Sequence, residues 1–326
     1  MIRCVVIGCG WAGMHHLETI VLSNHARLGA VVDADPEKLR MLSEKYGVPA
    51  YASLEELIAS GTEFDAAVVS TLAPLHKEQC LMLIEAGKHI LCEKPVCRST
   101  QDIAFLKECA GKAGTRFGAV FNQRFGDAVQ KAKELITEEG DTIHLVTASM
   151  YQHWPTKTGG HIDEYFMITD ACTHLLDVVT YLCGRVAAVT AVANKVESEL
   201  YSDVVAALLF ENGAVGTFSH TNVGGKLDTQ HPFQCIDVHT KKFRLRIENQ
   251  FDRLIVYRHD DMAQQVYETS VFKRRDYSVS LMRACEGFLN AVDTNTPLPA
   301  DIDEALVNMR VIDAIKQSIT VPKTQV

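Results

Sequence analysis

A short glycine-rich segment near the N-terminus restricts the fold of this 326-residue chain more than any other feature. A continuous apolar run, residues 3–7, leads into residues 8–13 (GCGWAG), and residues 11–23 have the apolar spacing of a helix. A second apolar run, residues 28–32, ends at Asp33. A strand, a glycine turn, a helix, a strand and an acidic residue, in this order, are typical of a βαβ unit that binds a dinucleotide.

Each glycine of this G-x-G-x-x-G motif has a physical role. Gly8 permits the tight turn, Gly10 lets a pyrophosphate approach the backbone, and Gly13 lets the helix pack close to the sheet. Backbone N–H groups at the helix N-terminus, including those of Trp11 and Ala12, are expected to face the phosphates. A glycine turn without a ligand is the alternative, and the flanking strands argue against it.

The acidic residue predicts which dinucleotide binds. The carboxylate of Asp33 can accept hydrogen bonds from both hydroxyls of the adenosine ribose, and its charge would repel a 2′-phosphate. Ala34 follows, where an NADP-binding protein often has arginine. We therefore expect NAD as the cofactor, in preference to NADP.

The first third of the chain continues the alternation of strands and helices. Further helices are predicted at residues 36–46, 76–86 and 100–113, and further strands at 66–70, 89–92 and 116–121. Short strands that are apolar throughout are buried on both faces, as in a parallel sheet. Residues 1–122 are therefore predicted to form a doubly wound α/β domain, a Rossmann fold that binds NAD.

Beyond residue 122 the pattern changes. A helix (127–138), a strand (142–151), an irregular segment (152–165) and a helix (169–182) precede six strands at 188–196, 204–210, 214–220, 233–239, 243–248 and 254–258. Glu211-Asn212-Gly213 is a plausible hairpin turn, and helices at 278–292 and 302–318 end the chain. Residues 123–326 are therefore predicted to form an α+β domain for substrate binding and oligomerisation, with a large, mostly antiparallel open sheet.

The predicted helices of this domain can cover only one face of the sheet. The strand at residues 204–210 (VVAALLF) is too apolar for either of its sides to face water. We therefore expect the open face to pair with another subunit in a homodimer or homotetramer.

Composition excludes several classes of partner. The chain has 32 basic and 41 acidic residues, so it lacks the basic surface that nucleic acids or anionic membranes attract. No apolar stretch approaches the ~18 residues of a membrane-spanning helix, and the N-terminus lacks the pattern of a signal peptide. The ten cysteines include no Cys-x-x-Cys pair and are expected to be buried, reduced thiols in a cytoplasmic protein.

A charged pair lies where the strand at residues 89–92 ends. Glu93 and Lys94 precede Pro95, which restricts Lys94 to extended backbone geometry. Strand C-termini in such sheets face the ligand crevice. A solvated surface pair is the alternative interpretation.

Taken together with further motifs, these features make the sequence resemble the glucose–fructose oxidoreductase / inositol dehydrogenase (Gfo/Idh/MocA) family over nearly its whole length. The resemblance rests on short motifs spread along the chain: G-x-G-x-x-G-x-x-H ending at His16, the strand at residues 65–70 with Thr71 and His76, Glu93-Lys94-Pro95, Asn122-Gln123-Arg124-Phe125, and Asp170 and His174 followed by Asp177. The combination of that lysine with an aspartate and a histidine four residues apart is the specific part.

The resemblance implies that Lys94, Asp170 and His174 form a catalytic group at the mouth of the N-terminal sheet. A neutral histidine suits removal of a hydroxyl proton while hydride leaves for nicotinamide, a lysine stabilises the developing alkoxide, and an aspartate orients the pair. Whether Lys94 or His174 takes the proton stays open. An ordinary polar pair on a helix is the alternative for Asp170 and His174.

The resemblance also places other residues near the ligands. Thr71, His76 and Glu93 are expected beside the cofactor. Asn122 and Arg124 are candidates for the substrate site, where Arg124 could hold a substrate oxygen or a phosphate; a structural salt bridge is the alternative.

Departures from the family pattern surround the expected substrate. Leu72 stands where the family has proline, Glu164-Tyr165-Phe166 replaces a glycine triplet, and Ala171-Cys172-Thr173 separates Asp170 from His174 in place of Ile-Gly-Val. They put the identity of the substrate in doubt and leave NAD binding intact.

Aromatic and imidazole side chains crowd the irregular segment before Asp170. Tyr151, His153, Trp154 and His161 suit a sugar, whose apolar face stacks on rings and whose hydroxyls need hydrogen-bond partners. A packed surface loop is the alternative. No metal site is expected, because His231, Cys235 and His239 alternate along a strand without a fourth ligand.

These features favour a reversible NAD-dependent oxidation of a ring secondary hydroxyl on a sugar, sugar derivative or cyclitol. An alternative keeps the same site but uses transient oxidation to eliminate a glycosidic group, as an NAD-dependent glycosidase or lyase. An alternative of another class is a non-catalytic regulator that senses a dinucleotide.

Overall fold

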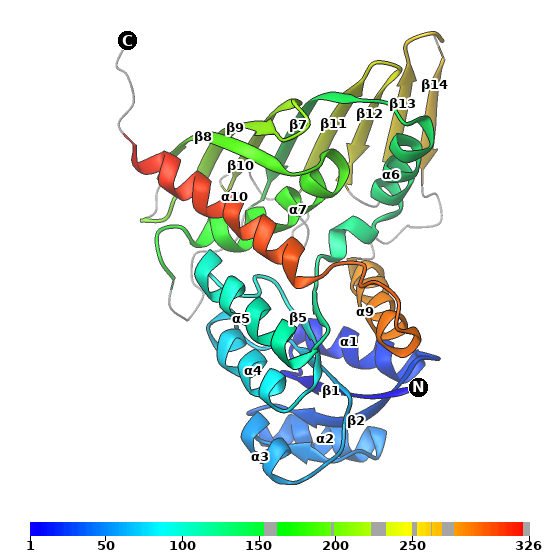
Figure 1. The fold of residues 1–326 in the computed structure, drawn as a ribbon, viewed down its shortest axis with the longest axis vertical. Coiled ribbons are helices and arrows are strands. Elements are labelled where there is room, and N and C mark those ends of the chain that lie inside the picture. The colour runs from blue at the N-terminus through cyan, green and yellow to red at the C-terminus, as the bar shows by residue number, and fades with distance from the viewer. Residues whose placement is uncertain are drawn as a thin grey trace. The chain divides into compact units, whose positions relative to one another are not determined.

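The computed structural model describes residues 1–152, 162–196, 199–222, 233–249, 253–261, 263–268 and 277–321 (Figure 1). The chain divides into two compact units. The first unit comprises Met1–Asn122 and Ser278–Leu306, and the second comprises Gln123–Tyr277 and Val307–Val326. The predicted division between residues 122 and 123 coincides with one of these borders, but residues 278–306, predicted in the second domain, belong to the first unit.

The first unit contains a six-stranded sheet in the order β3-β2-β1-β4-β5-β6, in which every pair of neighbours is parallel. This confirms the doubly wound α/β prediction. Its elements are β1 (Ile2–Ile7), α1 (Trp11–Leu22), β2 (Ala26–Val32), α2 (Pro36–Tyr46), β3 (Ala50–Tyr51), α3 (Leu54–Ala59), β4 (Ala66–Val69), α4 (Ala73–Glu85), β5 (His89–Cys92), α5 (Thr100–Ala113), β6 (Phe117–Ala119) and most of α9 (Tyr277–Thr294).

The central strands of this sheet are buried on both faces. Every residue of β4 is fully buried, as are residues 4–7 of β1, although successive side chains point to opposite sides. The helices begin where their sequences supply caps, since Asp35 accepts hydrogen bonds from the N–H groups of Glu37 and Lys38 at the start of α2. Buried apolar strands and capped helices thus stabilise the fold of the first unit.

Residues 278–306 close the far edge of the same unit. The N–H of Ala119 in β6 donates to the carbonyl of Ala300 (3.1 Å), and a Cβ at Gly118 would lie 3.0 Å from the ring of Phe288 in α9. The N-terminal ammonium of Met1 pairs with Asp293 at 2.6 Å. A late segment of the chain therefore packs against the N-terminal sheet, at β6 and beside the start of β1.

The second unit is built on an eight-stranded sheet in the order β14-β13-β12-β11-β7-β10-β9-β8. Among the strands that the structure describes here, only β7 and β10 pair in parallel, which confirms a mostly antiparallel sheet. Its elements are α6 (Asp127–Glu139), β7 (Ile143–Tyr151), a π-helical turn (Met167–Ala171), α7 (Cys172–Cys183), β8 (Val186–Asn194), β9 (Asp203–Phe210), β10 (Val215–Thr221), β11 (Phe233–Thr240), β12 (Phe243–Glu248), β13 (Arg253–Arg258), β14 (Gln264–Glu268) and, from Val307, α10 (Ile302–Thr320).

Helices cover one face of this sheet and leave the other open. Helix α7 packs on β7 and β11, and α6 packs on β12 and β13, from the same side (Figure 1). In β9 the covered face buries Val204 and Phe210, whereas Val205 and Leu209 on the other face are 52% and 46% exposed. Val192 and Val215 on the neighbouring strands are also exposed. The open face therefore carries a group of apolar side chains.

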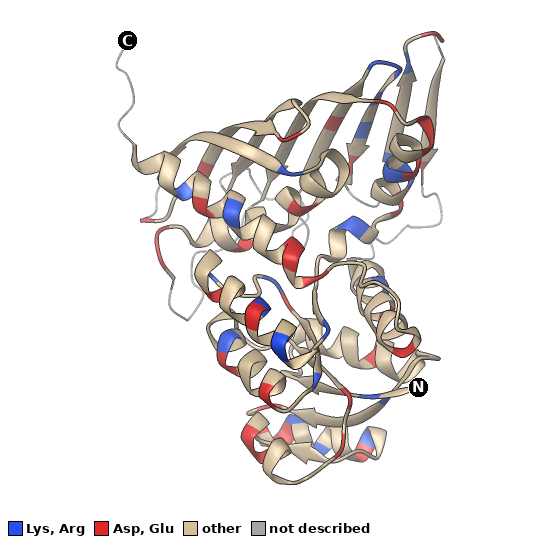
Figure 2. Ribbon diagram, viewed as in Figure 1, with Lys and Arg blue, Asp and Glu red and all other residues tan. Residues whose placement is uncertain are grey.

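Charges of both signs are interspersed over the described chain (Figure 2). Within the described residues, no helix combines the length and the apolar character needed to cross a membrane.

Candidate functional site

The glycine turn between β1 and α1 has the geometry that the motif predicts. Gly8 has a φ of +86°, and a Cβ there would lie 2.8 Å from the backbone of Ser70 and Thr71. A Cβ at Gly13 would lie 1.9 Å from the carbonyl oxygen of Gly8. Around Gly10 nothing lies within 4 Å of the corresponding position. Two glycines are thus required by packing, and Gly10 leaves open space where a pyrophosphate could approach the backbone.

Asp33 is fixed at the end of β2 by three donors. Its carboxylate accepts hydrogen bonds from the N–H groups of Cys9 (2.7 Å) and Asp35 (3.0 Å) and from the ammonium of Lys38 (3.2 Å). Burial raises the pKa of Asp33, but these hydrogen bonds outweigh it, so the pKa falls below its usual value. The carboxylate is therefore ionised and tied to the glycine turn, and none of its three donors was predicted from the sequence.

The Glu93-Lys94-Pro95 segment follows β5 and contains a cis peptide bond between Lys94 and Pro95. The carboxylate of Glu93 lies 3.0 Å from Nε2 of the fully buried His16 and accepts the N–H of Lys94 at 3.1 Å. Burial raises the pKa of Glu93, while His16 and Lys94 lower it to a net value below the usual one. Glu93 thus links helix α1 to the backbone of Lys94.

His76 and Thr71 form a second link beside this segment. The ring nitrogens of His76 lie 3.0 Å from the carbonyl oxygen of Pro95 and 3.2 Å from that of Thr71, and the side chain is 1% exposed. The hydroxyl of Thr71 donates to Gln79 at 2.6 Å. Both residues were expected beside the cofactor, and the structure shows that they connect the turn after β4 to the turn that holds Lys94.

All the candidates of the first unit therefore lie at one edge of its sheet. The glycine turn follows β1, Asp33 follows β2, Thr71 follows β4 and Lys94 follows β5. These four strands are neighbours in the sheet and are parallel, so their carboxyl ends share an edge. Trp11, at the start of α1, is 58% exposed and meets the His15 ring edge-on.

In the second unit, Asp170 lies on a π-helical turn and His174 lies on the α-helix that follows it. Asp170 belongs to the π-helical turn Met167–Ala171, a form that is frequent at functional sites, and His174 belongs to α7. Asp170 is half-buried and His174 is 8% exposed. Sequence reasoning predicted one continuous helix here and did not anticipate the change in winding.

Tyr277 is a candidate that sequence reasoning missed. Its hydroxyl lies 3.2 Å from Nε2 of His174, and the two rings are perpendicular with centroids 6.2 Å apart. More than a hundred positions separate the two residues, and no motif includes Tyr277. Only the fold reveals this contact.

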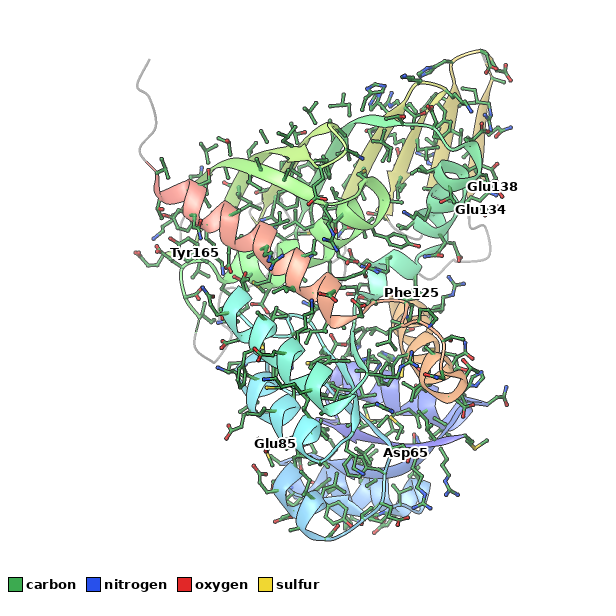
Figure 3. The ribbon with its side chains drawn as sticks, in the orientation of Figure 1. Asp65, Glu85, Phe125, Glu134, Glu138 and Tyr165 are labelled. Atoms are coloured by element: carbon green, nitrogen blue, oxygen red, sulfur yellow. The ribbon has the colours of Figure 1, made fainter. Side chains whose placement is uncertain are left out.

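The segment before the π-helical turn replaces the glycine triplet of the family pattern. Tyr165 (Figure 3) stacks on Tyr201 with ring centroids 5.3 Å apart, and Glu164 pairs with Lys195 at 2.8 Å. The N–H of Thr169 donates to the carbonyl of Tyr165. Bulky side chains thus attach this segment to the connection between β8 and β9.

Arg124 forms the structural salt bridge that the sequence analysis gave as an alternative to a substrate contact. Its Nε donates to Asp177 at 3.1 Å, with both side chains at most 3% exposed, and its guanidinium lies over the ring of Tyr181. Asn122, which is fully buried, donates to the hydroxyl of Ser280 at 2.7 Å.

The remaining substrate candidates are not brought together with His174 by the described structure. Tyr151 is 41% exposed on the open face of the sheet, where its ring lies 6.0 Å from that of Phe233. His153, Trp154 and His161 lie outside the described residues. The residues that the structure describes contain no group of three His, Cys, Asp or Glu that could hold a metal ion.

Two family models cover most of this sequence. Residues 2–121 match the model of the GFO/IDH/MocA oxidoreductase family with an NAD-binding Rossmann fold, and residues 129–242 match a C-terminal domain model of the same family. An uncharacterized oxidoreductase of Streptococcus pneumoniae is 29% identical over 56% of this chain and 51% of its own, so the match spans about half of that relative.

Two further comparisons extend over nearly the full length. A myo-inositol 2-dehydrogenase of Thermotoga maritima is 26% identical over 97% of this chain and 96% of its own. The structure of a levoglucosan dehydrogenase in complex with NADH and levoglucosan has the same fold, with a TM-score of 0.83 over 98% of this chain and 97% of its own at 20% identity. The chain described here therefore belongs to the Gfo/Idh/MocA oxidoreductase family.

Proposed function

We propose that this protein is an NAD-dependent dehydrogenase that reversibly oxidises a secondary ring hydroxyl of a sugar, a sugar derivative or a cyclitol. The observation that carries the proposal is the edge of the first sheet, where an ionised Asp33, a glycine turn with open space at Gly10 and the anchored Lys94 follow neighbouring strands. The full-length relative is a myo-inositol dehydrogenase, and the structural relative holds NADH and levoglucosan, which supports a polyhydroxylated substrate.

Several residues of the first unit support the binding of NAD. Gly8 and Gly13 keep the turn tight, and Gly10 offers an unobstructed backbone to the pyrophosphate. Asp33 is proposed to accept hydrogen bonds from the adenosine ribose, with NAD preferred over NADP. NAD supplies the acceptor for the hydride that leaves the substrate carbon.

We assign proton removal and alkoxide stabilisation to Lys94 and His174. Loss of hydride requires loss of the hydroxyl proton, for which a neutral imidazole is a base, while an ammonium stabilises negative charge on the substrate oxygen. Asp170 is proposed to orient this pair. The proposal requires Lys94 from the first unit and Asp170 and His174 from the second to act on the same substrate molecule.

A substrate screen tests the proposal. The protein is incubated with NAD and a panel of sugars, sugar derivatives and inositols, and formation of NADH is followed by absorbance. Net NADH formation with one of these compounds is expected. Substrate conversion without NADH accumulation would identify the glycosidase or lyase chemistry instead, and dinucleotide binding without conversion of any substrate would favour a regulator.

We also propose that the open face of the second sheet joins two copies of the chain. Val192, Val205, Leu209 and Val215 would lose their contact with water in such a pair. Light scattering at micromolar concentration is expected to give a dimer or tetramer, and Val205→Glu with Leu209→Glu should give a monomer. A monomeric wild type would contradict the proposal.

A further inference from the structure

Lys38 places a positive charge directly beside Asp33. Its ammonium lies 3.2 and 3.3 Å from the two carboxylate oxygens of Asp33, with the lysine side chain 32% exposed and the aspartate 12% exposed. Lys38 is the third residue of α2 and reaches back to the end of β2. The residue expected to select the ribose therefore carries its own counter-charge, which remains accessible to water.

The positive charge of Lys38 lies in the first turn of α2, where it interacts unfavourably with the helix dipole. Acidic residues stabilise the first turn of a helix and basic residues the last, because of the helix dipole. Helix α2 has Glu37 in its first turn and Lys45 in its last, in agreement with this rule, whereas Lys38 opposes it. The ammonium of Lys38 is instead held by Asp33, which points to a role at the cofactor site.

NAD and NADP differ only at the 2′ position of the adenosine ribose, which Asp33 is expected to face. NAD has a hydroxyl at the 2′ position of the adenosine ribose, and NADP has a phosphate with about −1.5 to −2 charges. Asp33 alone would repel that phosphate. An ammonium has three N–H donors. Among the described residues, the ammonium of Lys38 donates only to the two oxygens of Asp33, so it can also bind a further acceptor.

We infer that Lys38 is a second determinant of cofactor choice, which binds the 2′-phosphate of NADP and so makes this protein tolerant of both dinucleotides. NAD stays preferred, because Asp33, Asp35 and Glu37 oppose a single lysine around the start of α2. The preference is nevertheless smaller than Asp33 alone would impose.

Binding of NADH and NADPH to single variants tests this inference. Quenching of intrinsic tryptophan fluorescence gives both dissociation constants without any substrate. Lys38→Ala should weaken NADPH binding about 10- to 100-fold, the range of one lost charge-assisted hydrogen bond, and change NADH binding by less than about threefold. Lys45→Ala, in the last turn of the same helix, is the matched control and should change neither constant. An equal loss for both dinucleotides, or unchanged NADPH binding, would overturn the inference.

A double-mutant comparison separates direct contact from an effect through Asp33. In an Asp33→Asn background the repelling charge is absent, while the side-chain carbonyl can still accept the N–H of Cys9. If Lys38 binds the phosphate directly, Lys38→Ala should still weaken NADPH binding in this background. If the effect of Lys38→Ala disappears there, Lys38 acts only by holding or neutralising Asp33, and the inference is wrong.

The inference rests on the dinucleotide binding that the proposed function includes, and not on the reaction. Because the titrations contain no substrate, failure to find a sugar or cyclitol substrate would leave them informative. Conversely, equal affinities of wild type and Lys38→Ala for NADPH would leave the proposed dehydrogenase reaction intact.

Discussion

The two units hold their candidate residues in different ways. In the first unit, each candidate follows a strand of one parallel sheet, and Asp33, Glu93 and His76 contact backbone groups of the neighbouring turns. In the second unit, Asp170 and His174 lie on a helical segment, and the distant side chain of Tyr277 contacts His174. A site that is positioned by the turns after strands can be recognised in the sequence from short motifs. A contact between two side chains that are distant in the sequence gives no such motif.

The largest expected effect tests whether the two units contribute to one reaction. Lys94→Ala and His174→Ala should each lower turnover about 10²- to 10⁴-fold, because each removes a group assigned to the proton or to the alkoxide. Asp170→Asn should lower it less. The affinity for NAD should stay near that of the wild type in all three variants, as measured by fluorescence titration.

The double variant sharpens this test. If both residues serve one proton path, combining Lys94→Ala with His174→Ala should cost much less than the product of the separate losses. Steady-state turnover of the single and double variants measures this. Near-normal turnover of His174→Ala would show that the proton leaves by another route.

A second expected effect concerns the stability of the second unit. Arg124→Ala removes the guanidinium that pairs with the buried carboxylate of Asp177 and should lower the free energy of unfolding by about 3–5 kcal/mol. Lys195→Ala breaks the exposed pair with Glu164 in the same unit and should cost less than about 1 kcal/mol. Chemical denaturation gives both values. Similar losses in the two variants would show that burial does not set the strength of the Arg124 pair.

A third effect compares two glycines of the same turn. Gly13→Ala places a methyl group 1.9 Å from the carbonyl oxygen of Gly8, so it should lower stability by about 1–3 kcal/mol and also weaken NAD binding. Gly10→Ala meets nothing within 4 Å and should keep the stability of the wild type while weakening NAD binding. Thermal unfolding and NAD titration measure the two effects. Unchanged NAD affinity in Gly10→Ala would contradict the assignment of the pyrophosphate site.

Periodicity and motifs predicted much of the first unit because its signals are local. Apolar strands, helix caps and the glycine turn are each encoded within a few residues, and they gave the parallel sheet. The short elements β3 and α3 were missed, since two and six residues carry too little periodicity. Strand β14 was missed because all five of its residues are exposed and only Val266 and Tyr267 are large and apolar.

Long-range partners could not be predicted in the same way. The contact of Glu93 with His16 and that of His174 with Tyr277 join residues that the sequence separates widely. The return of residues 278–306 to the first unit depends on Phe288 and Ala300 packing at Gly118, which no local pattern records. Lys38 was passed over because a lysine near a helix start resembles an ordinary surface residue.

The smallest expected effect concerns Tyr277, which we propose as a positioning residue for His174. Tyr277→Phe removes the hydroxyl 3.2 Å from Nε2 of His174 and keeps the perpendicular ring contact. Loss of one hydrogen bond of about 0.5–1.5 kcal/mol should lower kcat about 2- to 10-fold, with KM and NAD affinity unchanged. Tyr277→Leu also removes the ring and should lower kcat further, because aromatic contacts add about 0.5–1.5 kcal/mol. Steady-state kinetics of both variants beside their thermal unfolding is the measurement. If kcat falls only in the variant that also loses thermal stability, Tyr277 serves the fold of the second unit and does not position His174.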